Sequence, residues 1–282
     1  FQSMITEKGN ASGSAFKFPN TVYNAAGGYL SICSGIKGYN VTVTNGAQSG
    51  LASMAYAMSV LRSGQENAML ATGSDENSDI MTELFGKLGV TSESVITPFE
   101  GNDGFVLSDG SASVLIEDEK AARERGARIY CHAAGYGMAH SNVKFGTLTG
   151  SEAGLTNAVN NALADAGMTI DDIDAVFGFA NGMKAVDDVE IKGLTAVFGD
   201  KLAEKPVVEL KEVLGESRAA AATTAAAHAA LMFAGKIPSQ EAYSIAADGS
   251  VSKTNVEASK LNNVLVVAYG AGGSYTAIVL SK

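Results

Sequence analysis

The sequence predicts an α/β fold built from two related halves, and three observations lead to it. Apolar, β-branched segments alternate with helix-forming segments, which favours sheets that are covered by helices. Two segments, 43–64 and 103–119, recur in the same order as 210–235 and 266–282. The chain has only 4 prolines in 282 residues, which fits long regular elements.

The elements follow from local composition. Apolar and β-branched runs predict strands at 40–44, 67–72, 104–107, 111–117, 127–137, 173–179, 206–210, 263–269 and 274–280. Runs of helix formers predict helices at roughly 20–35, 49–63, 78–87, 118–125, 151–166, 186–198 and 218–234. The alanine-rich run inside the last helix predicts a buried helix that packs closely on its neighbours.

The repeats divide the chain into an N-terminal half, 5–125, and a C-terminal half, 126–282. The second half opens with a strand, a helix and a second strand, whereas the first half has only a helix before its strand at 40–44. We therefore expect the first half to be truncated, without a starting strand and its crossover. The opening Phe1-Gln2-Ser3-Met4 resembles the remnant of an expression tag and is left out of this comparison.

Composition excludes several functions. The net charge of −10 lacks the basic footprint of nucleic-acid binding, and it would repel an acidic carrier protein unless a local basic patch exists. No apolar run reaches the roughly 18 residues that a bilayer crossing needs. Two cysteines, no visible signal peptide and no metal-binding spacing predict a cytoplasmic protein without a disulfide framework, a metal or a cofactor.

The stretch TNGAQSGLAS, at 44–53, predicts a tight turn between a strand and a helix. Such a turn suits a nucleophile, because the free N–H groups and positive dipole end of the helix stabilise a thiolate or an alkoxide. The residue at its tip is Ala47, whose methyl group cannot form a covalent intermediate.

Several motifs in a fixed order carry a family resemblance, and they cover nearly all of 5–282. They are FPNTVYNAAG at 18–27, GAQSGL at 46–51, LRSG at 61–64, PFE at 98–100, DGFVL at 103–107 and YGAGG at 269–273. With these motifs the chain resembles the β-ketoacyl synthases, condensing enzymes of the thiolase fold. The resemblance implies two pseudo-repeated βαβ halves in a layered αβαβα arrangement, and roughly the first hundred residues of that family have no counterpart here.

The resemblance also implies a catalytic cysteine, two histidines and a lysine. The cysteine position is Ala47, the two histidine positions are Asn181 and Glu216, and the lysine is kept as Lys211. An asparagine cannot shuttle protons near neutral pH, and a carboxylate opposes a developing enolate or oxyanion. By the same resemblance, the substrate-binding positions are Gln48, Phe105, Tyr269, Gly272 and Gly273.

Other reactive residues offer little. Gln48 lies one residue after the position at which related decarboxylating subunits carry glutamine, so its side chain is expected to point elsewhere. Neighbours in a strand face opposite sides, so Cys131 and His132 should not form a dyad. His140 is expected in a loop, and His228 in the alanine-rich helix as a structural residue.

The resemblance therefore implies a catalytically inactive subunit, similar to a chain length factor, of a fatty acid or polyketide synthase. It would pair with an active β-ketoacyl synthase, or with itself, shape the acyl tunnel, and meet an acyl carrier protein indirectly. Two alternatives stay open: an active synthase or malonyl decarboxylase that uses other residues, and an acyl-chain-binding scaffold.

Lys211 and Glu216 are expected to form a structural pair inside the remaining pocket, with Glu216 at the start of the helix at 218–234. The alternative is that both side chains face solvent, where such a pair contributes little.

Overall fold

The computed structural model describes residues 2–101, 104–144 and 150–282 and separates into two units, Phe1–Thr44 and Asn45–Lys282. The first unit contains helices α1 (Gln2–Lys8) and α2 (Ala25–Ser34) with short 3-10 turns between them. The second unit holds the sheets, the core and every candidate site residue.

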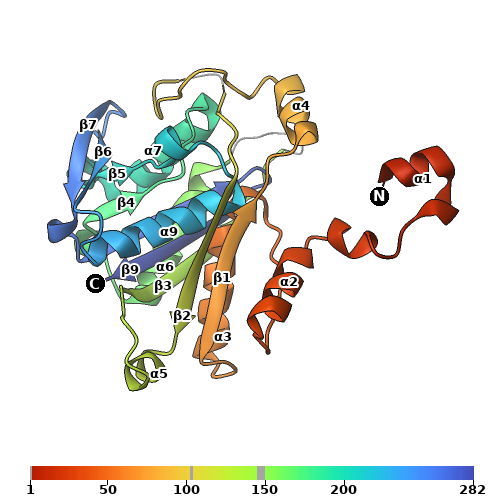
Figure 1. Ribbon diagram of the computed structural model, residues 1–282. Helices are drawn as coiled ribbons and strands as arrows, with labels where there is room; N and C mark the ends of the chain where they lie inside the picture. The colour runs from red at the N-terminus through yellow and green to blue at the C-terminus, as the bar shows by residue number, and fades with distance from the viewer. Residues whose placement is uncertain (1, 102–103, 145–149) are drawn as a thin grey trace. The chain divides into compact units, whose positions relative to one another are not determined.

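A seven-stranded sheet organises the second unit, in the order β3-β9-β8-β4-β5-β6-β7 (Figure 1). Strands β8, β4 and β5 run parallel, while β9 and β6 are antiparallel to their neighbours. The seven strands are β3 (His132–His140), β4 (Ala175–Phe177), β5 (Val207–Val208), β6 (Ser239–Ile245), β7 (Val251–Glu257), β8 (Asn263–Gly270) and β9 (Ser274–Ser281).

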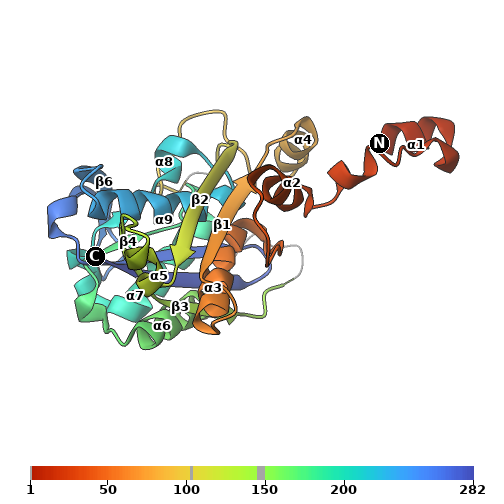
Figure 2. The same cartoon turned by 60° about the horizontal axis from the view of Figure 1, so that its bottom comes forward.

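A second sheet contains two strands, β1 (Ala68–Asp75) and β2 (Gly110–Glu117), which pair antiparallel over eight positions. Helices α3 (Ser49–Arg62) and α9 (Ala219–Phe233) form a layer between the two sheets (Figures 1 and 2). Helices α6 (Glu152–Ala166) and α7 (Lys184–Phe198) cover the other face of the seven-stranded sheet. Three short helices complete the unit: α4 (Asp79–Lys87), α5 (Glu119–Glu124) and α8 (Lys211–Leu214).

Two glycines allow the closest approach between the two repeats. A Cβ on Gly50 of α3 would lie 2.2 Å from the carbonyl oxygen of Ala219, and one on Gly73 of β1 would lie 2.4 Å from the same atom. Both would also lie within 2.5 Å of Thr223 Oγ1 on α9. Real Cβ atoms cannot be this close to a backbone oxygen, so α3, β1 and α9 pack at this point only because both residues lack side chains.

Most of the predicted elements are present, and the repeat reappears as matching strand pairs, β1–β2 and β8–β9. The thiolase-like arrangement of alternating helical and sheet layers is confirmed. Among the described residues of Asn45–Lys282, the first-half sheet contains the two strands β1 and β2, and the expected truncation stays a prediction. The division at 125/126 describes the repeats and stays a prediction.

Several element predictions are wrong. Residues 40–44 form no strand, and 104–107 contribute only isolated bridges at Phe105 and Leu107, because strand propensity forms no ladder without a neighbouring strand. The strand predicted at 127–137 begins at His132, and the helix predicted at 20–35 covers only Ala25–Ser34. The β6–β7 hairpin and α8 were not predicted.

None of the helices in the described part of the chain has the length and apolar character that a membrane crossing demands. Among the same residues, no group of three or more His, Cys, Asp and Glu side chains is placed to hold a metal ion.

Candidate functional site

The tip before α3 is a tight 3-10 turn that places Ala47 at the head of the helix. Gly46 has φ +68°, and the turn Gly46–Gln48 leads directly into Ser49. Ser49 Oγ closes the turn: it accepts from the Asn45 N–H at 2.7 Å and donates to the Gly46 carbonyl at 2.6 Å. The predicted turn and helix are present here, whereas the strand expected before them is not.

The β8–β9 hairpin approaches this tip. A Cβ on Gly270 would lie 3.4 Å from the Asn45 carbonyl oxygen and 3.5 Å from the Ala47 nitrogen. Gly272 and Gly273 form the turn of the hairpin with φ +105° and +84°, values that L-residues rarely adopt. The two glycines therefore shape the turn that holds Gly270 beside Ala47.

Gln48 is fully buried, and its side chain contacts β9. Its Oε1 accepts a hydrogen bond from Thr276 Oγ1 on β9, and no partner is found for its Nε2 among the described residues. The expectation that Gln48 is displaced from the catalytic position stays a prediction.

Asn181, Lys211 and Glu216 meet in a buried network, although they come from three different segments. Glu216 Oε2 accepts from Lys211 Nζ at 2.8 Å and from Asn181 Nδ2 at 3.0 Å. Glu216 Oε1 accepts from the Arg218 N–H at 2.8 Å. The Lys211 and Glu216 side chains are each 5% exposed, so the prediction of a buried ion pair is confirmed.

The remaining polar atoms of this network are also occupied. Lys211 Nζ donates to the Phe179 carbonyl at 3.0 Å and lies 3.1 Å from the centre of the Phe179 ring. Asn181 Oδ1 accepts from the Met183 N–H at 3.1 Å. The network is therefore closed in the sense that each side-chain nitrogen and oxygen of Asn181, Lys211 and Glu216 has a protein partner.

Residues with positive φ and backbone hydrogen bonds fix the main chain on both sides of Glu216. Gly215 has φ +77°, and the Glu216 N–H donates to the Val106 carbonyl at 2.7 Å. Arg218, with φ +48°, precedes α9, and its guanidinium binds both carboxylate oxygens of Asp75. Glu216 thus lies three residues before α9, and its carboxylate accepts from the Arg218 N–H. The expectation that Glu216 is the first residue of this helix is therefore wrong.

Asp187 joins two segments of the site, although it is not among the residues predicted from the sequence. Its Oδ1 accepts from the N–H groups of Asn181 and Gly182 at 3.0 and 3.2 Å, and its Oδ2 accepts from the Phe99 N–H at 2.8 Å. Phe99 has φ +69°, which this bond helps to hold. Burial raises the pKa of Asp187 to about 6, against the lowering effect of these hydrogen bonds.

Two further buried acids lie behind the network. Glu190 Oε2 accepts from the Phe179 N–H at 2.7 Å. Burial raises the pKa of Glu209 well above its usual value, and the nearby charge of Glu190 raises it further. The spacing of Asp187 and Glu190, three residues apart on α7, was the available sequence signal, since it places both carboxyls on one helix face.

A continuous chain of contacts connects the tip to the network. Tyr269, adjacent to Gly270, packs edge-on against Phe179 at 5.6 Å and donates to the Val186 carbonyl at 3.1 Å. Phe179 in turn contacts Lys211. Phe105 lies in a separate small apolar cluster with Val90 and Ile96. The cluster reaches the site because Ile96 lies against Gly182.

The other reactive residues lie elsewhere. Cys131 and His132 form no dyad: burial raises the pKa of the Cys131 thiol to about 11, and His132 Nδ1 faces Glu119 Oε2 at 3.7 Å. His140 ends β3, not a loop as expected, with Nδ1 3.4 Å from Ser274 Oγ. Burial lowers the pKa of His228, which packs against Phe177 in the core.

Curated relatives place this geometry in context. The chain is 29% identical to a 3-oxoacyl-[acyl-carrier-protein] synthase 2 of Vibrio harveyi, over 73% of this chain and 52% of that protein. It is 30% identical to a putative polyketide β-ketoacyl synthase 2 of Streptomyces coelicolor, over 92% of this chain and 63% of that one. The chain thus spans about half to two thirds of the length of these relatives.

Solved structures share the fold. The ishigamide ketosynthase/chain length factor matches with a TM-score of 0.87 and 21% identity, over 100% of this chain and 70% of that chain. A β-ketoacyl synthase of Burkholderia phymatum matches with a TM-score of 0.86 and 20% identity, over 100% and 71%. The family models of the N-terminal and C-terminal domains of β-ketoacyl synthase match residues 2–122 and 130–243. The chain therefore belongs to the β-ketoacyl synthase family.

Proposed function

We propose that this chain is a non-catalytic, ketosynthase-like subunit, similar to a chain length factor, of a fatty acid or polyketide synthase. It would pair with an active β-ketoacyl synthase and contribute to the wall of the acyl tunnel. The observation that carries the proposal is the closed network at the family's catalytic positions, in which Glu216 is bound by Lys211, Asn181 and the Arg218 N–H.

The chemistry of the network supports this proposal. Condensation needs a nucleophile, and Ala47 offers only a methyl group at the tip. Decarboxylation needs hydrogen-bond donors aimed at a developing enolate, and the Asn181 amide and the Lys211 ammonium are already bound to Glu216. The charges of Lys211 and Glu216 cancel as a pair. The main obstacle to stabilising an enolate is therefore the lack of free hydrogen-bond donors, rather than repulsion by the Glu216 charge.

The retained framework supports a role in an assembly. The tip, the α3–α9 layer and the β8–β9 hairpin are all formed, although Ala47 leaves the tip without a nucleophile. One similar structure is a ketosynthase/chain length factor, and another is an acyl-carrier protein in complex with its ketosynthase. Both similarities favour a synthase and a carrier protein as the partners to test first.

The test has two measurements. The chain is incubated with a radiolabelled acyl-carrier thioester beside an active synthase as the positive control, and we expect no covalent label on the chain. It is then co-expressed with that synthase, and sedimentation velocity should show a heterodimer. In a sample of the chain without the synthase, the same measurement should show a homodimer.

Covalent labelling would favour the enzyme alternative. A stable monomer at micromolar concentration that binds acyl-carrier protein without any synthase would favour the scaffold. Either result would contradict the proposal.

A further inference from the structure

Glu190 of α7 and Glu209, directly after β5, are buried acids that take no part in the hydrogen bonds around Glu216. Glu190 is fully buried and Glu209 is 4% exposed. Glu190 Oε1 and both carboxyl oxygens of Glu209 have no hydrogen-bond partner among the described residues. An ionised carboxylate is costly to bury without a donor, so these oxygens need a donor that the neighbouring side chains do not supply.

The backbone brings the two carboxyl groups together. Gly178 lies directly after β4, and its N–H donates to the Val208 carbonyl at 3.0 Å, which fixes it beside Glu209. A Cβ on Gly178 would lie 1.9 Å from Glu209 Oε1 and 2.2 Å from Glu190 Oε1. Both oxygens therefore approach a single point, in the space that the absent side chain leaves free.

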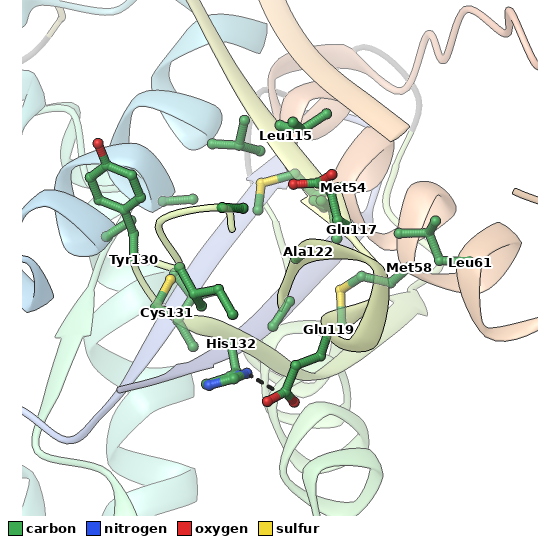
Figure 3. A pocket seen from close by; sticks show the side chains of 18 of the residues that line it. Met54, Met58, Leu61, Leu115, Glu117, Glu119, Ala122, Tyr130, Cys131 and His132 are labelled. Carbon is green, nitrogen blue, oxygen red and sulfur yellow. Dashed lines mark ion pairs between the residues drawn. The ribbon is translucent and has the colours of Figure 1, made fainter. Parts of the chain in front are cut away.

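Acids at the surface of the same unit show the usual alternative, which is an ion pair. Figure 3 shows one at the rim of an apolar cavity, where Glu119 faces His132. Glu119 also binds Arg123 at 2.6 Å. In contrast, no described lysine, arginine or histidine lies within ion-pair distance of Glu190 or Glu209. Their charge is therefore not balanced by direct contact.

The charged groups around Glu209 oppose its ionisation on balance. Asp187 and Glu190, both on α7, lie close enough to repel a charge on the Glu209 carboxyl. Lys211 on α8 attracts such a charge, but Glu216 already binds the Lys211 ammonium at 2.8 Å. Two like charges that share a buried site cannot both persist, so one of the carboxyls must carry a proton.

Two tyrosines complete the surroundings of Glu209, with Tyr243 on β6 and Tyr269 on β8. Burial raises the pKa of both phenols, so both are neutral and neither balances the acids. Burial also raises the pKa of Glu209 well above its usual value, and the charge of Glu190 raises it further. Glu209 is therefore the member of the pair that holds the proton.

We propose that Glu190 and Glu209 hold one proton between them, with the hydrogen on Glu209 and its bond directed to the Glu190 carboxylate. The O–H group turns one unpartnered acceptor into a donor and gives Glu190 Oε1 the partner that it lacks. A neutral Glu209 also does not compete with Glu216 for Lys211, so the proton helps to keep the network closed. This inference does not depend on the proposed function.

Infrared spectroscopy tests the proton directly, because a protonated carboxylic acid has a carbonyl stretching band that an ionised carboxylate lacks. The whole chain is measured at about pH 7, where exposed carboxyl groups are ionised. The band should be present, and it should move to lower frequency when the side-chain carboxyl carbon of glutamate is labelled with carbon-13 by cell-free synthesis. Labelling of aspartate should leave it in place, which separates Glu209 from Asp187 without any variant.

Two variants assign the band to Glu209. Glu209→Gln should remove it, whereas Glu241→Gln, the same exchange at an exposed position of β6, should leave it unchanged. In Lys211→Met the band should persist to a higher pH than in the unmodified chain, because the Lys211 charge favours ionisation of Glu209. The labelling result decides the question even if Glu209→Gln fails to fold.

Denaturant titrations give a second measurement. A pKa that is higher in the folded chain than in the unfolded chain contributes stability at low pH, and this stability is lost as pH rises through the folded pKa. Above about pH 6.5 the unfolding equilibrium constant of the unmodified chain should rise up to about tenfold per pH unit relative to that of Glu209→Gln. Glu241→Gln should follow the unmodified chain.

Three results would overturn the proposal. The first is the absence of the band at neutral pH, which would mean that both carboxyls are ionised. The second is a band that ignores the glutamate label or survives in Glu209→Gln. The third is loss of the band when potassium or magnesium chloride replaces choline chloride at equal ionic strength, which would mean that a metal cation takes the place of the proton.

Discussion

Removing both members of the buried Lys211–Glu216 pair should destabilise the protein by less than the sum of the two single losses. In Lys211→Met, the Glu216 carboxylate keeps the Asn181 and Arg218 N–H donors but loses its counter-ion in a site where both side chains are 5% exposed. Breaking a buried pair in this way costs about 3–5 kcal/mol. In Glu216→Gln, the Lys211 ammonium keeps the Phe179 carbonyl and ring, and we expect a cost of about 3 kcal/mol.

The double variant should be less than additive, with a coupling free energy of about 1–3 kcal/mol, because the glutamine keeps its neutral hydrogen bonds and no unpaired charge remains. In a unit of this size, 1 kcal/mol corresponds to roughly 2–4 °C in melting temperature. The melting temperature of each single variant should therefore be roughly 6–20 °C lower. The fall in melting temperature of the double variant should be clearly smaller than the sum of the two single falls.

A control on an exposed ion pair sharpens the test. Lys184→Met is the matched control, because Lys184 pairs with Asp188 at 2.8 Å but is 65% exposed, and it should cost at most about 0.5 kcal/mol. Unchanged melting curves for all three variants of the buried pair, or strictly additive losses, would refute the reasoning.

Three further predictions concern other parts of the second unit. Ala47→Cys should restore a thiol at the tip but give no chain elongation, because Asn181 and Glu216 supply no catalytic proton transfer; measurable elongation in a carrier-protein assay would show that these positions are wrongly assigned. Burial raises the pKa of Asp187 to about 6, so the free energy of unfolding should fall by roughly 3 kcal/mol as pH rises from about 4 to 6. In Asp187→Asn, denaturant titrations at several pH values should no longer show this decline. An unchanged dependence of the free energy of unfolding on pH would contradict the prediction. Gly50→Ala should destabilise by about 1–3 kcal/mol, because its Cβ meets the Ala219 carbonyl. Gly86→Ala, on α4 with open space around it, should stabilise by about 0.4–1 kcal/mol, and the opposite order of melting temperatures would count against the packing argument.

Local sequence predicted the long helices and the buried strands well, because their composition and their neighbours agree. Strand propensity at 40–44 was misleading, since these residues have no adjacent strand to pair with. The β6–β7 hairpin was missed for the opposite reason: it lies at the sheet edge and carries many polar residues, although the turn Asp248–Gly249 was a usable signal.

The network around Glu216 was predicted in part. The motif spacing placed Lys211 and Glu216 close together, because only a short helix and a glycine turn separate them. The contributions of Asp187 and Phe179 depend on how α7 and the loop after β4 approach α8, which is a tertiary arrangement that residue types alone do not encode.

The contact of Gly50 and Gly73 with Ala219 and Thr223 also has a consequence for how the protein is made. The apolar face of α3, with Leu51, Met54 and Met58, cannot be covered by α9 until residue 223 has left the ribosome. At the usual pace of synthesis that delay lasts roughly 10–35 s. During this time the nascent first half presents an uncovered apolar helix, which makes it a substrate for chaperones that hold apolar segments.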